Sequence, residues 1–152
     1  MTDVVVIGAG PAGVLAAIRA ADLGARTTLV TSAEFGGMAA NDGPVPVRAL
    51  AYAARLLRDA RQLPDYGLIG SEPVLEFDRL LARVREVVQD VRAHSVLRER
   101  IDSLGVTVHE HCGPVRFTGP NSIEAGRGLR LEAEKFIICT GAVSRRLAIP
   151  GI

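Results

Sequence analysis

A run of branched apolar residues that leads directly into a glycine-rich turn constrains this chain more than any other feature. Residues Val4–Ile7 form the run, and the turn Gly8–Gly13 follows at once. A continuous apolar run of this kind is typical of a strand that is buried on both faces of a parallel sheet. Small and apolar residues at helical spacing predict a helix over Pro11–Leu23. A second strand is predicted over Thr27–Val30, so the N-terminal part predicts a β-α-β unit.

Three glycines in this turn have the spacing of a nucleotide-binding loop. Gly8 would permit a tight turn, Gly10 would let a pyrophosphate approach the backbone, and Gly13 would allow the helix to pack closely on the strand. The pattern alone is weak because the chain has 16 glycines, and a glycine turn that only packs is the alternative. The flanking strand and helix favour dinucleotide binding. The candidate cofactor-binding residues of the loop are Gly8, Gly10, Pro11, Ala12 and Gly13.

A loop of this kind predicts an acidic residue about twenty positions further on, at the end of the second strand. This chain has no acidic residue there. Thr31 and Ser32 occupy that place, and the nearest acid is Glu34. A hydroxyl can bond to a ribose hydroxyl, but this neutral bond is weaker than one to a carboxylate. We therefore expect Thr31 and Ser32 to contact the ribose with reduced affinity, in an unchanged fold.

The rest of the chain alternates helical patterns with short strand patterns. We expect a loop over Glu34–Gly43, followed by an amphipathic helix that turns Leu50, Ala53, Ala54 and Leu57 inward. The other expected elements are helices over Val47–Leu63 and Phe77–Leu104, strands over Val106–Val108 and Lys135–Cys139, and an antiparallel meander of Val115–Phe117, Ser122–Glu124 and Leu129–Leu131. This order predicts an α/β, Rossmann-like domain with a parallel sheet, helices and a small antiparallel β-meander.

Composition and charge narrow the classes of function. Hydrophobic residues make up 48% of the chain and charged residues 23%, as in a folded globular protein. Lys and Arg number 18 against 17 Asp and Glu, for a net charge of +1, and aromatic residues are only 4%. Because the chain has no block of basic residues and few aromatic side chains on which bases could stack, we expect a small-molecule partner and no nucleic acid. No apolar run approaches the roughly 20 residues of a spanning helix, so we expect no membrane partner.

The cysteines and histidines predict neither a metal site nor a secreted protein. Cys112 and Cys139 lie far apart without CxxC spacing, and no basic region of a signal peptide precedes the first strand. We therefore expect a cytoplasmic protein, with Cys139 as a small buried side chain of its strand. His109 and His111 would share one face of a strand, but two histidines do not close a metal site, and we expect surface or packing roles.

Motifs along the whole chain resemble those of one family. They are the strand and loop Val4–Gly13, the triplet Phe35-Gly36-Gly37, the segment Phe136–Ala142 and the tripeptide Ile149-Pro150-Gly151. This ordered set resembles the FAD-dependent pyridine nucleotide-disulfide oxidoreductases, which include dihydrolipoamide dehydrogenase and mercuric reductase. The resemblance implies that the glycine loop holds the diphosphate of FAD and that Thr140-Gly141 lies beside the same cofactor. An ordinary turn at a strand end is the alternative for these two residues.

The resemblance fails where this family carries its redox disulfide. Ala39 and Pro44 stand at the positions of the two family cysteines. Neither side chain forms a thiolate or a disulfide, so dithiol exchange at this place is excluded. Arg48 stands at the position of a family lysine near the flavin and would keep a positive charge there, and the alternative is an arginine on a helix surface. The remaining candidate cofactor-binding residues are Gly36, Gly37, Asn41 and Val115.

The resemblance implies that residues 1–152 are the N-terminal part of an FAD/NAD(P)-binding domain, and the chain looks truncated before the NAD(P) domain. We expect the FAD-binding segment of an NAD(P)H-dependent flavin oxidoreductase that does not use a redox disulfide, with a homodimer as a further expectation. One alternative is an isolated nucleotide-binding module or structural fragment without catalytic turnover. Another is a compact NAD(P)-binding domain that serves as a sensor or partner subunit, although the match over Phe35–Arg48 favours FAD.

Overall fold

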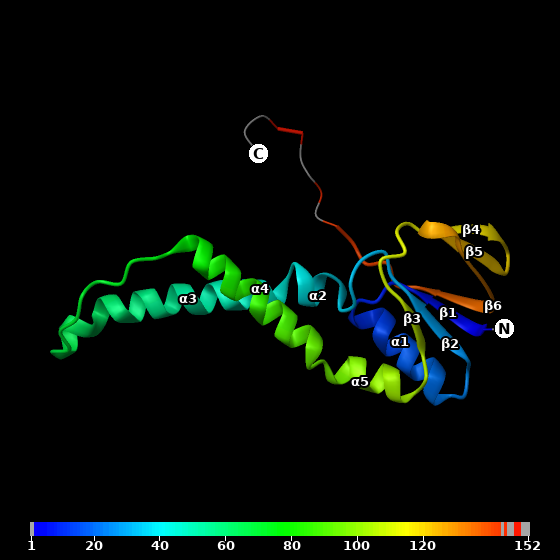
Figure 1. Ribbon diagram of the computed structural model, residues 1–152, viewed down its shortest axis with the longest axis horizontal. Helices are drawn as coiled ribbons and strands as arrows, with labels where there is room; N and C mark the ends of the chain where they lie inside the picture. The colour runs from blue at the N-terminus through cyan, green and yellow to red at the C-terminus, as the bar shows by residue number, and fades with distance from the viewer. Residues whose placement is uncertain (1, 144, 146–147, 150–152) are drawn as a thin grey trace.

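The computed structural model describes residues 2–143, 145, 148 and 149, and a six-stranded sheet forms its centre (Figure 1). The elements in chain order are β1 (Thr2–Ile7), α1 (Pro11–Asp22), β2 (Thr27–Val30), α2 (Gly37–Asn41), α3 (Pro44–Gln62), η1 (Leu63–Tyr66), α4 (Phe77–Ala93), α5 (Val96–Ser103), β3 (Thr107–His109), β4 (Arg116–Gly119), β5 (Ser122–Ala125), η2 (Gly126–Gly128) and β6 (Leu129–Ile138). The strand order is β3-β2-β1-β6-β5-β4. Pro150 and Gly151 of the last motif lie outside the described residues.

The predicted β-α-β unit is confirmed. Strands β1 and β2 pair in parallel, with Val4 opposite Thr27 and Ile7 opposite Val30. Strand β3 continues the parallel sheet beyond β2, and β6 pairs in parallel with the other side of β1. Because β1 lies between two parallel neighbours, its apolar run is the central strand that the pattern predicts.

Strand β1 is buried on both faces. Val6 packs with Leu29 of β2 and Ile101 of α5 on the face that α1 covers. Val5 lies on the opposite face, where it packs with Ile123 of the antiparallel meander. Val5 and Val6 are both 0% exposed. The meander therefore acts as the second cover of the sheet, and the α/β fold predicted from the sequence is confirmed.

The meander and the last parallel strand share one strand, which corrects the prediction of two. The first half of β6 pairs antiparallel with β5, from Leu129 to Glu132, and its second half pairs in parallel with β1, from Ala133 to Ile138. No glycine or proline interrupts residues 129–138. The strand therefore continues across the boundary at which the sequence pattern changes.

The helices depart from the prediction at three places. The expected loop over Glu34–Gly43 contains α2, whose single turn is closed by Asn41 Nδ2 donating to the Gly37 carbonyl at 2.9 Å. Helix α3 begins at Pro44, since proline suits the first helical position. The long helix predicted to end at Leu104 is two helices, α4 and α5. Ser95 separates them, with an extended backbone and a side chain that accepts from the Arg98 N–H at 3.4 Å.

Helices α3 and α4 form a long hairpin that extends away from the sheet (Figure 1). None of the α3 side chains is buried, and Leu50, predicted to turn inward, is 37% exposed. Ala54 is also exposed, whereas Ala53 and Leu57 are half-buried. The predicted inward side of α3 is therefore wrong for two of its four residues, because the main contacts of this helix are with α4, the short α2 and η1 and not with the sheet.

Candidate functional site

The carboxyl ends of β1, β2 and β6 meet at one edge of the sheet, and backbone hydrogen bonds tie them together. The Gly8 N–H donates to the Val30 carbonyl of β2 at 2.7 Å. The Cys139 N–H donates to the Ile7 carbonyl of β1 at 2.7 Å. The chain leaves β1 toward β2 on one side and reaches β6 on the other, so the strand order changes direction here. Open α/β sheets bind ligands at such points.

The three glycines of the first loop have three different surroundings. Gly8 has a φ of +108°, and a Cβ there would lie 2.2 Å from the Cys139 carbonyl oxygen. A Cβ on Gly13 would lie 1.7 Å from the Gly8 carbonyl oxygen, so Gly13 lets α1 pack directly on the loop. A Cβ on Gly10 would meet nothing within 4 Å. The first and third glycines therefore serve close packing, and the second leaves space for a ligand.

A second pair of glycines packs directly against the glycine loop. Gly36 has a φ of +96°, and its N–H donates to the Ala9 carbonyl at 2.9 Å. Gly37 has a φ of +55°, and a Cβ there would lie 2.7 Å from the Gly10 Cα. Only glycine fits both the left-handed backbone and this close approach. The Phe35–Gly37 turn is therefore fitted to the glycine loop.

The Asn41 side chain holds this turn from the other side. Its Nδ2 donates to the carbonyls of Phe35 at 3.3 Å and Gly37 at 2.9 Å, which fixes the orientation of the amide. Its Oδ1 is buried and accepts no hydrogen bond within the part of the chain that the structure describes. The two donated bonds position Asn41 in the turn.

These elements enclose an open groove of about 880 Å³, within the range of about 300–1,000 Å³ that is typical of cofactor pockets. The predicted residues that line it are Gly8, Gly10, Pro11, Ala12, Thr31, Ser32, Gly37, Ala39, Asn41, Val115, Thr140 and Gly141. Three predicted cofactor-binding residues, Gly13, Gly36 and Arg48, are not part of the lining. Gly13 and Gly36 act through packing, whereas Arg48 is exposed on α3. Pro44 begins α3, also away from the lining.

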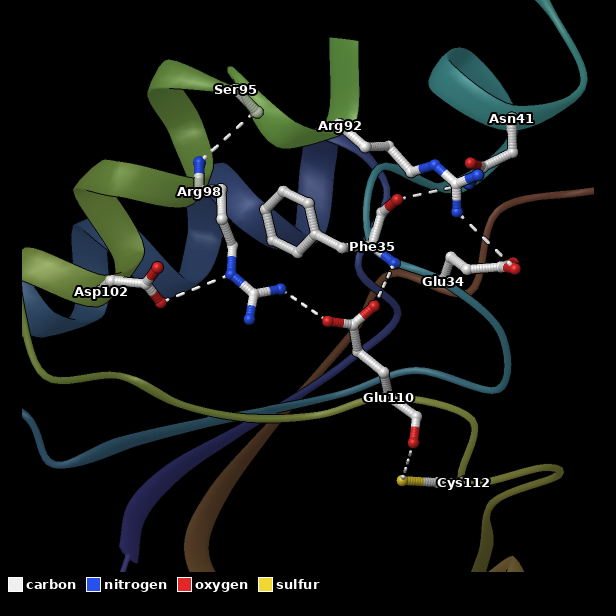
Figure 2. Close-up of polar contacts among 9 residues, drawn as sticks. All are labelled: Glu34, Phe35, Asn41, Arg92, Ser95, Arg98, Asp102, Glu110 and Cys112. Atoms are coloured by element: carbon white, nitrogen blue, oxygen red, sulfur yellow. Dashed lines mark hydrogen bonds and ion pairs between the residues drawn. The ribbon is translucent and has the colours of Figure 1, made fainter. Parts of the chain in front are cut away.

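The groove reaches the end of β2, where the sequence has a hydroxyl in place of the expected acid. Thr31 is 8% exposed, and its N–H donates to the His109 carbonyl at 2.9 Å. Glu34 also lines the groove, and its carboxylate lies 3.7 Å from the Arg92 guanidinium (Figure 2). An acidic side chain is therefore present in the groove, three residues later than the usual position.

Glu110 is a residue that sequence reasoning missed. Its Oε2 accepts from the Phe35 N–H at 2.8 Å, and its Oε1 accepts from Arg98 Nη1 at 2.5 Å (Figure 2). Burial raises the pKa of Glu110, but the hydrogen bonds from Arg98 and from the Phe35 N–H outweigh it, so this pKa lies below its usual range. The contacts span 12 and 75 residues, and no local pattern signals them.

The neighbouring histidines and cysteines need two corrections. His111 does not share a strand face with His109, because β3 ends at His109 and His111 has a φ of +55°. Cys139 follows β6 and is half-buried, while Cys112 is the buried cysteine. Neither forms a disulfide. Among the described residues, no group of three His, Cys, Asp or Glu could hold a metal ion, and no helix is long and apolar enough to cross a membrane.

Comparisons with known proteins point to one family. The family model described as pyridine nucleotide-disulphide oxidoreductase matches residues 2–152. The chain is 33% identical over 147 residues to dihydrolipoyl dehydrogenase of Zymomonas mobilis and 36% identical over 156 residues to dihydrolipoyl dehydrogenase 3 of Haloarcula marismortui. These matches cover 95% and 99% of the chain but 31% of each relative.

A solved structure has the same architecture. The HOCl-induced flavoprotein disulfide reductase RclA from Escherichia coli superposes with a TM-score of 0.72 at 27% identity. The match covers 99% of the chain and 30% of that protein. The similarity confirms the predicted Rossmann-like fold. The chain thus spans about a third of the length of the proteins that it resembles.

Proposed function

We propose, from the premise that this chain belongs to the pyridine nucleotide-disulphide oxidoreductase family, that it is the FAD-binding segment of a flavin oxidoreductase that does not use a redox disulfide. NAD(P)H is the proposed electron donor of the whole protein, which we place in the cytoplasm and expect to form a homodimer. The chain covers 31% of its relatives, so these statements concern the larger protein.

The open space at Gly10 carries the proposal. Gly10 precedes the first turn of α1 with φ −75° and ψ 178°, and no described side chain caps this helix end. Because Pro11 has no N–H, the first donors of α1 are the backbone N–H groups of Ala12 and Gly13, which can donate to an anionic group such as a diphosphate. Gly37 approaches Gly10 from the far side. The groove thus combines the backbone donors of the α1 N-terminus with the open space at Gly10, which fits the diphosphate of FAD.

The chain's own residues would bind, orient and shield the cofactor. The α1 N-terminus would bind the diphosphate, Thr31 or Glu34 would accept from the adenosine ribose, and Thr140-Gly141 would lie along the remaining half. When bound, FAD supplies two-electron chemistry, by which it takes hydride from NAD(P)H and passes electrons to an acceptor. Ala39 and Met38 line the groove with apolar atoms. Neither side chain provides a thiol, which supports an acceptor other than a dithiol on this chain.

A binding experiment with two matched variants tests the cofactor. The 152-residue chain should bind FAD, as seen by quenching of flavin fluorescence. Gly10→Val should weaken binding at least about tenfold, or about 1.4 kcal/mol, because its side chain enters the groove while its extended backbone accepts any residue. Gly70→Val is the control: its Cβ also meets nothing within 4 Å, but it lies outside the groove. Equal affinities of wild type and Gly10→Val contradict the placement of the diphosphate.

The same preparation distinguishes the competing functions. A chain that binds ADP and not FAD is a nucleotide-binding module and contradicts the flavin assignment. For the FAD-loaded chain, a reductive titration counts electrons. One electron pair per FAD supports chemistry without a disulfide, whereas uptake of a second pair reveals a redox-active disulfide and refutes that part of the proposal.

A further inference from the structure

The Glu110 carboxylate joins two segments that lie far apart in the sequence. It follows β3, and its two oxygens accept from different donors: Oε2 from the backbone N–H of Phe35 and Oε1 from the guanidinium of Arg98 (Figure 2). The Phe35 backbone belongs to the turn between β2 and α2, and Arg98 belongs to α5. A single side chain therefore connects the turn to a helix that packs on the sheet.

The Arg98 side chain supports the same turn directly. Its guanidinium lies over the Phe35 ring, 5.2 Å from the ring centre, while its Nη1 donates to Glu110. The Phe35 ring is 6% exposed and belongs to the core that contains Ile101. Asp102 is a second carboxylate beside Arg98, with its Oδ1 at 3.4 Å from Nε, but the Phe35 N–H donates to Glu110 and not to Asp102. Glu110 and Asp102 thus share one arginine and differ in their contact with Phe35.

The turn that Glu110 holds brings Gly37 into the lining of the groove. The Phe35 N–H donates to Glu110, and the next N–H along the chain, of Gly36, donates to the Ala9 carbonyl. The following residue, Gly37, lies against the Gly10 Cα. Three consecutive residues therefore connect Glu110 to the glycine at which the ligand approaches. A change in the position of Phe35 would be transmitted to the width of the groove at Gly10.

We propose that Glu110 is a positioning residue for nucleotide binding: its carboxylate, held by Arg98, fixes the Phe35–Gly37 turn at the distance from Gly10 that the FAD diphosphate requires. Glu110 does not line the groove, so it acts through the backbone and not by contact with the cofactor. This inference rests on the proposed function.

A carboxylate is needed because two donors face one side chain. An amide of the same shape has one acceptor oxygen, so Glu110→Gln leaves either the Phe35 N–H or Arg98 facing an NH2 group. An unpaired N–H in a half-buried place favours movement of the backbone toward another acceptor. We therefore expect Glu110→Gln to weaken FAD binding by about tenfold, by the loss of a single well-placed hydrogen bond.

The experiment compares three forms of the 152-residue chain: wild type, Glu110→Gln and the control Asp102→Asn. Asp102→Asn neutralises a carboxylate on the same arginine without touching the turn. The dissociation constant of FAD is measured at a temperature at which circular dichroism shows all three to be fully folded, which separates affinity from stability. The expected result is an affinity about tenfold lower for Glu110→Gln and unchanged for Asp102→Asn.

Three outcomes overturn the inference. The first is an unchanged FAD affinity of Glu110→Gln, whether or not this variant is less stable. The second is an equal loss of FAD affinity in both variants, and the third is a loss of FAD affinity in Asp102→Asn alone. If Glu110→Gln does not fold, Arg98→Met is used in its place. This change removes the guanidinium that holds the Glu110 carboxylate, while the methionine side chain still covers the Phe35 ring. An unchanged FAD affinity of Arg98→Met again overturns the inference.

A wild-type chain that binds no FAD contradicts the proposed function and leaves a separate test of the turn. Hydrogen exchange at the amides of Phe35 and Gly36 should then be faster in Glu110→Gln than in wild type and Asp102→Asn. Equal exchange rates in the three proteins contradict the positioning role.

Discussion

The contact between Gly13 and the glycine loop allows a quantitative test of how α1 packs on β1. A Cβ at position 13 would lie 1.7 Å from the Gly8 carbonyl oxygen and 3.2 Å from the Cys139 Cβ. Atoms of the backbone cannot rotate away as a side chain can. Real Cβ contacts are not shorter than 3.0 Å, so the change Gly13→Ala forces the first turn of α1 and the Gly8 carbonyl apart.

Two effects of opposite sign determine the result. Alanine in the interior of a helix is favoured over glycine by about 0.5–1 kcal/mol. Overpacking typically costs about 1–3 kcal/mol, and we take the upper end because the clash is with backbone. The displacement also separates Val14 and Ala17, which are 1% and 0% exposed, from the sheet. We therefore expect Gly13→Ala to lower the free energy of unfolding by about 2 kcal/mol.

Urea denaturation followed by circular dichroism measures this change. With a slope of about 1–3 kcal/mol per molar urea, a loss of about 2 kcal/mol lowers the unfolding midpoint by about 1 M. Gly70→Ala is the control, because its Cβ would meet nothing within 4 Å and it lies in a loop. A Gly13→Ala protein that is as stable as wild type, or more stable, refutes the inferred close packing of α1 on the loop.

Two further changes test the stability of the sheet layer. The Arg26 side chain and backbone donate to Asp3 and lower its pKa from 3.8 to about 2. The pair therefore stabilises the fold above pH 3.8, and this contribution is lost as the pH falls toward 2. Asp3→Asn should flatten that part of the pH dependence of urea unfolding, and an unchanged profile would contradict the role of the pair. Ile101→Ala should cost about 2–5 kcal/mol because Ile101 is 0% exposed, whereas Val96→Ala on the same helix, at a side chain that is 75% exposed, should cost less than about 0.5 kcal/mol. Equal effects of these two changes on the urea midpoint would contradict the packing of α5 on the sheet.

The parts of the fold that sequence reasoning predicted correctly are those that local patterns determine. The apolar run of β1, the glycine spacing and the helical pattern after Pro11 lie within a few residues of one another. They specify strand, turn and helix in order, and parallel pairing follows because the crossover helix leaves no other arrangement. The groove follows from the same unit, since Gly10 must lie where the strand ends and the helix begins.

Breaks in the helices were harder to predict because the apolar pattern continues through them. The stripe of Val84, Val88 and Ile101 agrees with one long helix, yet Ser95 ends one helix and begins another. Serine favours a helix start by bonding to the backbone, but its effect is about 1 kcal/mol and is decided by the packing around it. The break turns α5 back onto α1, where Ile101 becomes fully buried.

The periodicity of α3 indicates which side of the helix is apolar but not what covers that side. Leu50 is 37% exposed and Ala54 is also exposed, although both belong to the predicted inward side of the helix. The prediction that such residues turn inward assumes a core beside the helix, and here the hairpin extends away from the sheet (Figure 1). Periodicity is a property of one segment, whereas burial depends on its neighbours.

In residues 35–44, the contacts that fix the backbone do not involve the two positions at which the family carries its redox cysteines. Its shape depends on glycine backbones and on one amide: the Gly36 N–H bonds to Ala9, Gly37 packs on Gly10, and Asn41 bonds to the Gly37 carbonyl. None of these contacts uses the side chain of Ala39 or Pro44. The groove can therefore keep its form whatever chemical group stands at these two positions. For this reason the glycine spacing predicts a nucleotide site in such a chain, whereas its reaction must be inferred from the residues at positions 39 and 44.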